Sequence, residues 1–322
     1  MLSLIVLKQL VIMLVIALCG YIFAKVFKVT EGEQKFLSKL LLYFINPFLV
    51  FNSFVTTAFS MEKLKNMGIV AVVSLIIHFL MIGLAFVTIR KNRENSEEED
   101  YNIIDRLTVI FTNCGFVGIP LINSVFGPEG VLYLIGFLVC FNILLWTFGY
   151  KQMSGKINLK KIVTNPNIIA VFLGLFFYCT QIKLPQMIFV PMNSIANMNS
   201  PLAMILIGIL FASFKFDKKF IVRIIRTCFL RLIGSAVVSF IVIFIFFKIL
   251  LLVNFQTQEE ELYMMLFVPF ICSMCPSATS VPSLSCLFEK DAKYSSLLVC
   301  LTTMLCVLTI PSILALAELI IK

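Results

Sequence analysis

The stretch NCGFVGIPL at residues 113–121 lies within an apolar segment and contains two glycines and a proline between Gly115 and Pro120. Proline removes a backbone N–H donor and glycine tolerates strained backbone angles, so a helix through this stretch is expected to break. A second such stretch, CPSATSVP at residues 275–282, has two prolines spaced by six residues. Pro120 and Pro282 are 162 residues apart, and half of the 322-residue chain is 161. We therefore predict one broken helix in each half.

The composition places these breaks in a membrane. Hydrophobic residues make up 60% of the chain and charged residues 13%, with a mean hydropathy of +1.03, whereas soluble domains are about 45–50% apolar and about 25% charged. A soluble enzyme, a disordered chain and a secreted disulfide scaffold are excluded. Because a bilayer span needs about 20 apolar residues, stretches without charged residues predict ten helices. They are 9–24, 40–61, 66–89, 107–128, 130–150, 162–182, 184–214, 232–247, 262–288 and 294–317.

Two windows need interpretation. The window 184–214 is too long for one span and has Pro185 and Pro191 near its start, so we expect a connection over 184–193 and a helix over 194–213. The first window lacks the short apolar region and the cleavage site of a signal peptide, and we expect it to be the first membrane helix.

The net charge of +9 predicts an orientation rather than a nucleic-acid partner. With ten alternating helices, 20 of the 26 basic residues fall in one set of connections and 6 in the other. The positive-inside rule places the first set in the cytoplasm. We therefore expect a multi-pass protein of the cell membrane with both termini extracytoplasmic, a cytoplasmic face of +9 and an outer face of zero. Residues 94–100, with four acidic residues in a row, are interpreted as a solvated loop or a regulatory contact.

Ten helices divide into five and five, and an odd number per half makes the two halves inverted. We expect a first repeat over 1–150, a short cytoplasmic basic linker over 151–161 and a second repeat over 162–322. Matched breaks recur in the second helix of each half, at Asn46-Pro47 and at Ser200-Pro201. Inverted repeats with broken helices near the midplane are typical of secondary transporters. Ordinary kinks are the alternative, since glycine and proline are common in membrane helices.

The candidate site is built from neutral polar groups. Each half-helix N-terminus carries about half a positive charge, so two of them can attract an anion without any buried Lys or Arg. Asn113 offers donors suited to a carboxylate or to a water beside one. Further candidate partners are Asn142, Ser277, Thr279 and Ser280.

Several other residues have two interpretations each. Asn46 is expected to satisfy carbonyls freed at the second-helix break or to line the site. Asp105 pairs with Arg106 or neighbouring bases, or forms an inner entrance site. His78, the only histidine, is structural or functional. Cys272 and Cys275 form a CxxC without a second pair, so no metal site is predicted. Proton coupling, sodium coupling and uncoupled movement all stay open, because no carboxylate lies in mid-helix, and no cofactor is expected.

Four stretches resemble the auxin efflux carrier family, which includes the plant PIN carriers and bacterial permeases. NCGFVGIPL is similar to its N-x-x-x-x-G-I-P-L crossover, and NPN at 165–167 to the start of its second half. PLAMILIGILFA from Pro201 resembles its helix seven. ILLW, ending at Trp146 with Asn142 four residues earlier, resembles its helix five. The PIN carriers' long central loop is missing, which favours the short bacterial-type permease branch.

The resemblance implies an all-α, NhaA- and PIN-like fold in which broken helices four and nine cross. It also implies elevator-type alternating access against a scaffold of helices one, two, six and seven, through which we expect a homodimer. By motif match, Asn113, Gly115, Gly118 and Pro120 carry over to the crossover in helix four, and Pro282 to that in helix nine. The helix-nine proline spacing is one residue longer than in plant carriers, so the resemblance does not fix the roles of Pro276, Ser277 and Thr279.

The predicted function is secondary transport of small organic anions, such as malate, malonate or auxin-like acids, across the cytoplasmic membrane. The alternative is a membrane receptor or sensor for a small organic acid that does not transport it. A channel is a further alternative. An intramembrane enzyme is not expected, because one histidine and no paired acids supply no catalytic constellation.

Overall fold

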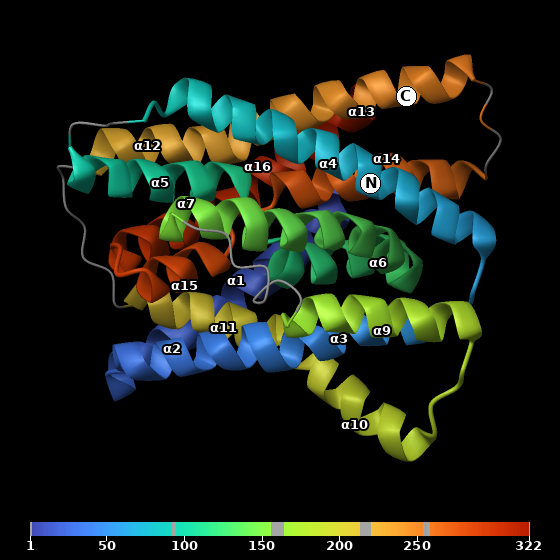
Figure 1. Cartoon of the computed structure of the whole chain (residues 1–322), viewed down its shortest axis with the longest axis horizontal. Coiled ribbons are helices and arrows are strands. Elements are labelled where there is room, and N and C mark those ends of the chain that lie inside the picture. Colours follow the sequence, from blue (N-terminus) through green and yellow to red (C-terminus); the bar gives the residue numbers. More distant parts are fainter. Residues whose placement is uncertain are drawn as a thin grey trace.

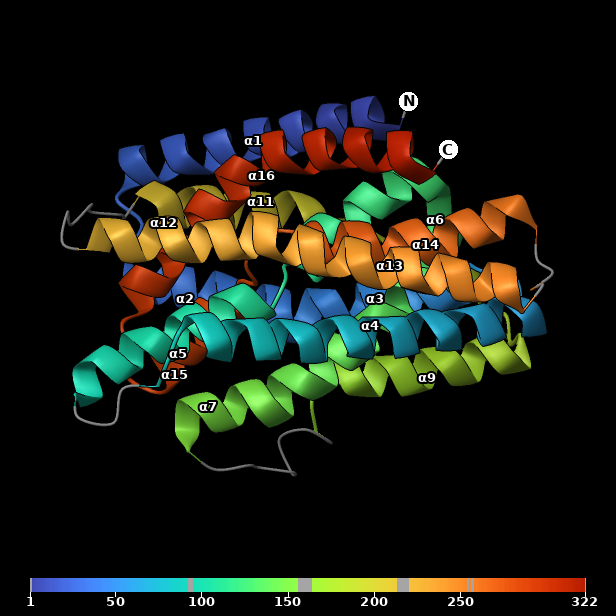
Figure 2. The same cartoon turned by 90° about the horizontal axis from the view of Figure 1, so that it is seen from above.

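The computed structural model describes residues 2–91, 95–155, 164–212, 220–253, 255 and 258–321. The described chain is helical, and its one β-type contact is an isolated bridge between Thr112 and Ser277. Long helices run roughly along one direction and stack in layers (Figures 1 and 2). The elements are α1 Leu2–Phe27, α2 Glu31–Leu40, η1 Leu41–Ile45, α3 Asn46–Val55, α4 Met61–Thr88, α5 Ser96–Ile110, η2 Cys114–Gly118, α6 Ile119–Leu144, η3 Leu145–Gly149, α7 Tyr150–Ser154, α9 Pro166–Thr180, α10 Gln186–Asn197, α11 Asn199–Ala212, α12 Ile221–Phe229, η5 Leu230–Gly234, α13 Ser235–Leu252, α14 Glu259–Met274, α15 Ser280–Leu287 and α16 Ala292–Ile321. The η elements are π-turns.

Within these residues, seven helices are long and apolar enough to cross a membrane. One of them, Cys114–Ser154, is 41 residues long, and its backbone leaves the helical region at Gly127, where φ is +66°. Pro128 follows directly. The shorter helix α9 is also apolar. The all-α membrane prediction is confirmed, whereas ten passes stay a prediction.

Two local predictions were wrong. Residues 186–193 form most of α10 instead of a connection, because Pro191 has a φ suited to a helix and costs only one hydrogen bond in a segment that projects from the bundle (Figure 1). The acidic run is not a loop, because Ser96 begins α5. The Asn95 side chain accepts a hydrogen bond from Glu98 N at 3.1 Å, and acidic residues suit a helix N-terminus. The predicted linker at 151–161 falls largely on 156–161, outside the described residues.

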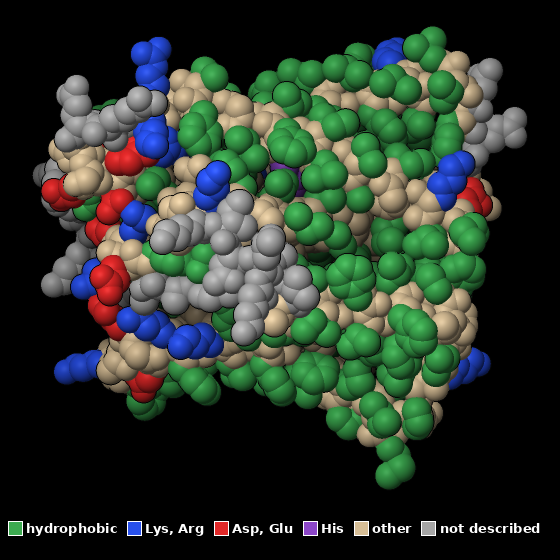
Figure 3. All heavy atoms as spheres, viewed as in Figure 1, with side chains coloured by type: hydrophobic (Ala, Val, Ile, Leu, Met, Phe, Trp, Pro, Cys, Tyr) green, Lys and Arg blue, Asp and Glu red, His purple; other side chains and the backbone are tan. Residues whose placement is uncertain are grey.

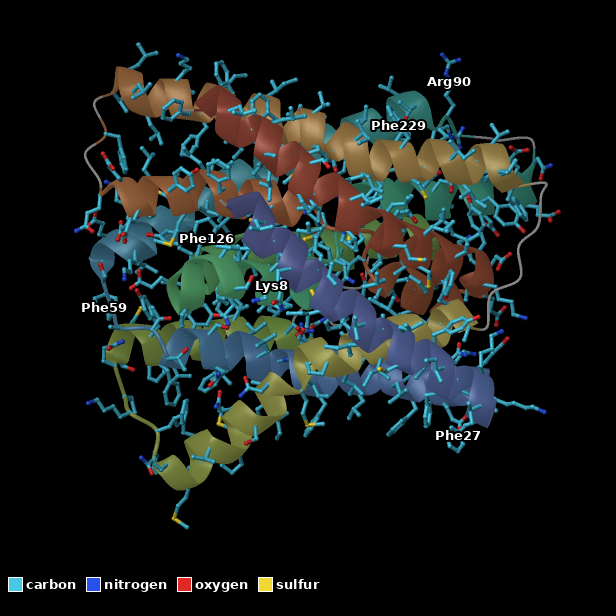
Figure 4. The ribbon with its side chains drawn as sticks, turned by 180° about the vertical axis from the view of Figure 1, so that it is seen from behind. Lys8, Phe27, Phe59, Arg90, Phe126 and Phe229 are labelled. Carbon is cyan, nitrogen blue, oxygen red and sulfur yellow. The ribbon has the colours of Figure 1, made fainter. Side chains whose placement is uncertain are left out.

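Hydrophobic side chains cover the middle of the surface in Figure 3, and charged side chains gather at its two ends. Most of these charges lie at the end where α5 and α12 begin (Figures 1 and 3). Seen from behind, Phe27 and Arg90 lie at one end of the molecule and Phe59 and Phe126 at the other (Figure 4). An apolar belt between two polar ends is the surface that a bilayer requires.

The interior is held together by pairs of helices that are distant in sequence. Helix α1 packs on α11, α3 on α9 and α4 on α6. The first pair is the tightest, because a Cβ atom on Gly20 would collide with the carbonyl oxygen of Ile205, and one on Gly208 with that of Ala17. Small residues that let backbones touch are a common basis of helix association in membranes.

Candidate functional site

The two predicted breaks meet. The first lies at 111–113, between α5 and η2, and the second at 275–279, between α14 and α15. Thr112 and Ser277 form an antiparallel bridge, in which Asn113 N donates to Pro276 O at 2.7 Å and Ala278 N donates to Phe111 O at 3.0 Å. Four half-helix ends therefore converge on one crossing.

The first break occurs earlier than the sequence motif indicated. Gly115 and Gly118 lie within the π-turn η2, and Pro120 opens α6, whereas the extended residues come before them. A Cβ atom on Gly118 would lie 3.5 Å from Cys275 Sγ, an ordinary van der Waals distance, so this turn packs against the second break. On the other side, Pro276 and Ser277 lie in the extended segment, Thr279 precedes α15, and Pro282 lies within it.

A buried arginine that the sequence did not predict holds the crossing. Arg231, in η5, is fully buried. Its Nη1 donates to Val109 O at 2.8 Å and its Nη2 to Ser273 O. These carbonyls belong to the last turns of α5 and α14, the two half-helices that end at the crossing. The prediction of a site without buried Lys or Arg was therefore wrong.

Arg231 changes the electrostatics of the crossing. The C-terminal ends of α5 and α14 each carry about half a negative charge, and the guanidinium carries one positive charge. These contributions cancel and leave the N-terminal ends of η2 and α15, each about half positive. The affinity of the crossing for an anion stays a prediction, and the arginine lies at the two helix ends that would repel one.

Hydrogen-bond donors at the crossing are unused. Asn113 Nδ2, Ser277 Oγ and Ser280 Oγ are buried and have no hydrogen-bond partner among the described residues. The Ser277 backbone N–H donates to Thr302 Oγ1 of α16 at 3.1 Å. A cavity of about 10 Å³ adjoins this region, lined by Ser38, Leu42, Phe116, Leu206, Thr279, Ser280 and Ser283. A cavity of this size suits about one water molecule.

Two asparagines from the second half of the chain donate hydrogen bonds to backbone carbonyls in the first half. These carbonyls lack a backbone donor because of nearby prolines. In a π-turn the partner of residue i is the carbonyl of residue i−5, so Pro47 leaves Leu42 O free and Pro120 leaves Gly115 O free. Asn167 Nδ2 donates to Leu42 O at 3.0 Å. Asn199 Nδ2 donates to Gly115 O at 3.5 Å.

Asn46 does not satisfy a freed carbonyl, contrary to one of its two interpretations. Its Nδ2 donates to Asn167 Oδ1 at 2.8 Å, and Asn167 supplies the bond to Leu42 O instead. Leu42 O lacks a backbone donor because the neighbouring Pro47 has no N–H. Asn142 is buried in α6, where its Nδ2 donates to Leu138 O of the same helix at 2.8 Å. The structure therefore does not join Asn142 to the hydrogen bonds of the crossing.

Asp105 lies in a separate cluster, which we call the Asp105 network. The buried carboxylate accepts hydrogen bonds from Tyr294 OH at 2.7 Å, Arg223 at 3.0 Å and Arg226 at 3.3 Å. Arg223 also bonds Asn102 and Glu98, both at 2.9 Å. Asp105 thus pairs with neighbouring bases.

Arg106 is bonded elsewhere, to Glu99 and to Ile89 O. Asp100 pairs with Lys290. Two residues at the acidic start of α5, Glu98 and Asp100, therefore form ion pairs with Arg223 and Lys290 from the second half of the chain, while their own side chains are half exposed.

The remaining candidates are buried. His78 is buried, its Nδ1 lies 2.7 Å from Ser74 O, and its ring contacts those of Phe137 and Phe141. Cys272 and Cys275 are buried free thiols. In the part of the chain that the structure describes, no group of three His, Cys, Asp or Glu side chains could hold a metal ion.

Comparison with known proteins gives two matches. A family model described as membrane transport protein matches residues 5–159 and 152–314, which together span most of the chain. An uncharacterized transporter of Methanocaldococcus jannaschii is 25% identical over 311 residues, which cover 93% of this chain and 94% of the relative.

Proposed function

The chain belongs to the membrane transport protein family, and from this premise we propose that it is a secondary transporter that moves small organic anions, such as carboxylates, across the cell membrane. The observation that supports an anionic substrate is the arrangement of charges and donors at the crossing. There Arg231 offsets two negative helix ends, and two positive helix ends remain beside the unused donors of Asn113, Ser277 and Ser280. A carboxylate supplies the acceptors and the negative charge that this arrangement lacks.

The proposed architecture has ten passes in two inverted halves. The 41-residue helix 114–154 counts as two passes, because Gly127 and Pro128 interrupt it and α5 extends its first part through the crossing. Helix α9 adds one pass, and α14 with α15 adds another. With the six other long apolar helices this makes ten. Both termini then lie outside the cell, as the distribution of basic residues favours.

The proposed mechanism is elevator-type alternating access. Helices α1 and α11 interlock through Gly20 and Gly208 and suit a fixed scaffold. The small cavity lies between residues of α2, η1 and α11 on one side and residues of η2 and α15 on the other. Sliding of the second group past the first would open this cavity to one side of the membrane and then to the other. A homodimer through helices one, two, six and seven, and coupling to protons or sodium, stay predictions.

Uptake into proteoliposomes tests the proposal. Purified protein would be offered labelled malate, malonate and an aromatic acid, with and without pH, sodium and voltage gradients, against empty liposomes. Saturable uptake of at least one acid, with exchange against internal unlabelled acid, is expected for a carrier. Absence of any carboxylate flux together with absence of thermal protection by these acids would refute anion transport. Flux that neither saturates nor exchanges would assign a channel.

A further inference from the structure

A chain of buried amides beside the crossing has a fixed direction. Leu42 O can only accept a hydrogen bond, so the nitrogen of the Asn167 amide must point toward it, as the 3.0 Å contact shows. The Asn167 oxygen is thereby turned toward Asn46. Asn46 must donate through its nitrogen, at 2.8 Å, and its own oxygen is left over. The missing N–H of Pro47 thus orients an amide from the other half of the chain.

The leftover oxygen lies at the crossing. Asn46 Oδ1 is buried, lacks a hydrogen-bond partner among the described residues, and lies 3.8 Å from where a Cβ atom of Gly115 would stand. Asn199 repeats the pattern at the same glycine. Its nitrogen faces Gly115 O, so its oxygen, also buried, is the atom without a partner. Two oriented acceptors therefore flank the first residues of η2.

Acceptors and donors at the crossing require different chemistry. The unused donors of Asn113, Ser277 and Ser280 suit a carboxylate, which has only acceptors to offer. A carboxylate cannot satisfy the oxygens of Asn46 and Asn199, and leaving a buried acceptor unpaired is costly. A ligand that satisfies both groups carries an acid together with an O–H or N–H.

We propose that the preferred substrate is an organic acid with a hydrogen-bond donor close to its carboxylate, as in a 2-hydroxy acid, and that Asn46 and Asn199 accept from that donor. The inference rests on the proposed anion transport and narrows its substrate class. Asn167 acts as a positioning residue, because it holds the Asn46 amide in the orientation that presents its oxygen. Gly115 is required beside them, since a large side chain there would fill the space in front of Asn46 Oδ1.

Matched pairs of acids test the inference in proteoliposomes. Malate and succinate differ by one hydroxyl, as do lactate and propionate. Wild-type protein is expected to move the hydroxy acid of a transported pair with a kcat/KM at least about tenfold higher, because a site built to bond a hydroxyl discriminates against the analogue that lacks it. Asn46→Leu and Asn199→Leu should each slow the hydroxy acid much more than the deoxy acid, so that the preference for the hydroxy acid falls. Asn167→Leu should reduce the preference only partly, because the Asn46 amide can then turn.

The matched control is Asn52→Leu. Asn52 lies on the same helix, α3, and its Nδ2 donates to Asn193 Oδ1 of α10 at 3.0 Å, so the variant removes a comparable amide pair without touching Gly115. Its preference for hydroxy acids should equal that of wild type. Thermal melts in detergent show whether each variant is folded, and Asn199→Leu keeps the test valid if Asn46→Leu is not.

Three outcomes overturn the inference. Equal transport of hydroxy and deoxy acids by wild type removes its basis. An equal fall for both acids in Asn46→Leu and Asn199→Leu assigns the asparagines to structure. Loss of sodium dependence in these variants with an unchanged preference assigns the two oxygens to a cation. In all three cases acids still move, whereas a failure of the proposed function leaves no carboxylate flux in wild type.

Discussion

The crossing and the Asp105 network both depend on arginine, but they use it in opposite ways. Arg231 is fully buried and bonds the backbone carbonyls of Val109 and Ser273. Arg223 is partly exposed and bonds Asp105 and Glu98, which are side chains of opposite charge. In the Asp105 network the arginine is neutralised by carboxylates. At the crossing Arg231 is neutralised by the C-terminal ends of α5 and α14. The positive N-terminal ends of η2 and α15 then stay available for a ligand.

The two arginine sites lie at different depths along the same pair of helices. Asp105 and Val109 are four residues apart on α5, and both contact the continuous helix of α12, η5 and α13. At the polar end of this contact, water can reach Arg226, whose side chain is 41% exposed. Deeper in the bundle, the Arg231 guanidinium bonds two backbone carbonyls. The predictions below test this contrast in order of the transport activity each change should remove.

Arg231→Leu should have the largest effect. It leaves two buried carbonyls without donors, each costing about 1–3 kcal/mol of stability, and it restores the negative potential of the two C-terminal helix ends. We expect transport to become undetectable and the melting temperature in detergent to fall. Arg231→Lys keeps the charge but loses the forked donor geometry, so partial activity is expected. Normal transport by a folded Arg231→Leu variant would show that the crossing does not need this charge.

Asn113→Ala should come second. The bridge uses the Asn113 main chain, so the crossing should stay intact with a stability change below about 1 kcal/mol, because the removed donor has no partner in the structure. Transport should fall roughly 10- to 100-fold, as expected for the loss of one hydrogen bond to a charged ligand. Initial rates and detergent melts measure the two effects. Wild-type rates would remove Asn113 from the site.

Asp105→Asn should reduce stability more than it reduces transport, which is the reverse of the result expected for Asn113→Ala. The neutral amide can still accept a hydrogen bond through its oxygen but forms no ion pair with Arg223 or Arg226, and breaking a buried ion pair costs about 3–5 kcal/mol. The measured loss should lie near or below the lower limit, because Arg226 can be resolvated. Transport should change only severalfold, since the carboxylate bonds none of the groups at the crossing. A complete loss of transport in a stable Asp105→Asn protein would instead support an entrance site.

Much of this arrangement could be predicted from the sequence, for local reasons. The prolines and glycines near residues 120 and 276 predict interruptions there, although the extended residues of the first break, 111–113, come before them. Hydropathy places both breaks in a membrane. Asn113 was identified because it adjoins such a break.

Arg231 was not identified, because it stands one residue outside an apolar window and resembles an interfacial charge. Its partners are 122 and 42 residues away in sequence. The helix of α12, η5 and α13 begins at Ile221, which places Arg231 about 15 Å along its axis at about 1.5 Å per residue. A search for charges more than two turns from the start of a long helix would have found it. The hydrogen bond between Asn167 and Leu42 O was also missed, because the two residues are 125 positions apart and only folding brings them together.

Lys63→Ala should have the smallest effect and serves as the reference for a charge that does neither task. Lys63 pairs with Glu129, whose side chain is 51% exposed. Exposed pairs contribute about 0–1 kcal/mol and are screened by salt. Transport should equal that of wild type, and the small difference in melting temperature should shrink at high ionic strength. A large loss of transport would mean that charges away from the crossing and the network also control activity.

The interlock of α1 and α11 has a consequence for how the chain can be divided. Helix α1 comes from the first half of the sequence and α11 from the second, and at Gly20 and Gly208 their backbones touch without intervening side chains. If the polypeptide were cut between residues 155 and 164, the contact between α1 and α11 would still give the two fragments a specific surface through which to associate. Co-expressed halves should therefore reassemble, and an alanine at Gly208 should prevent it.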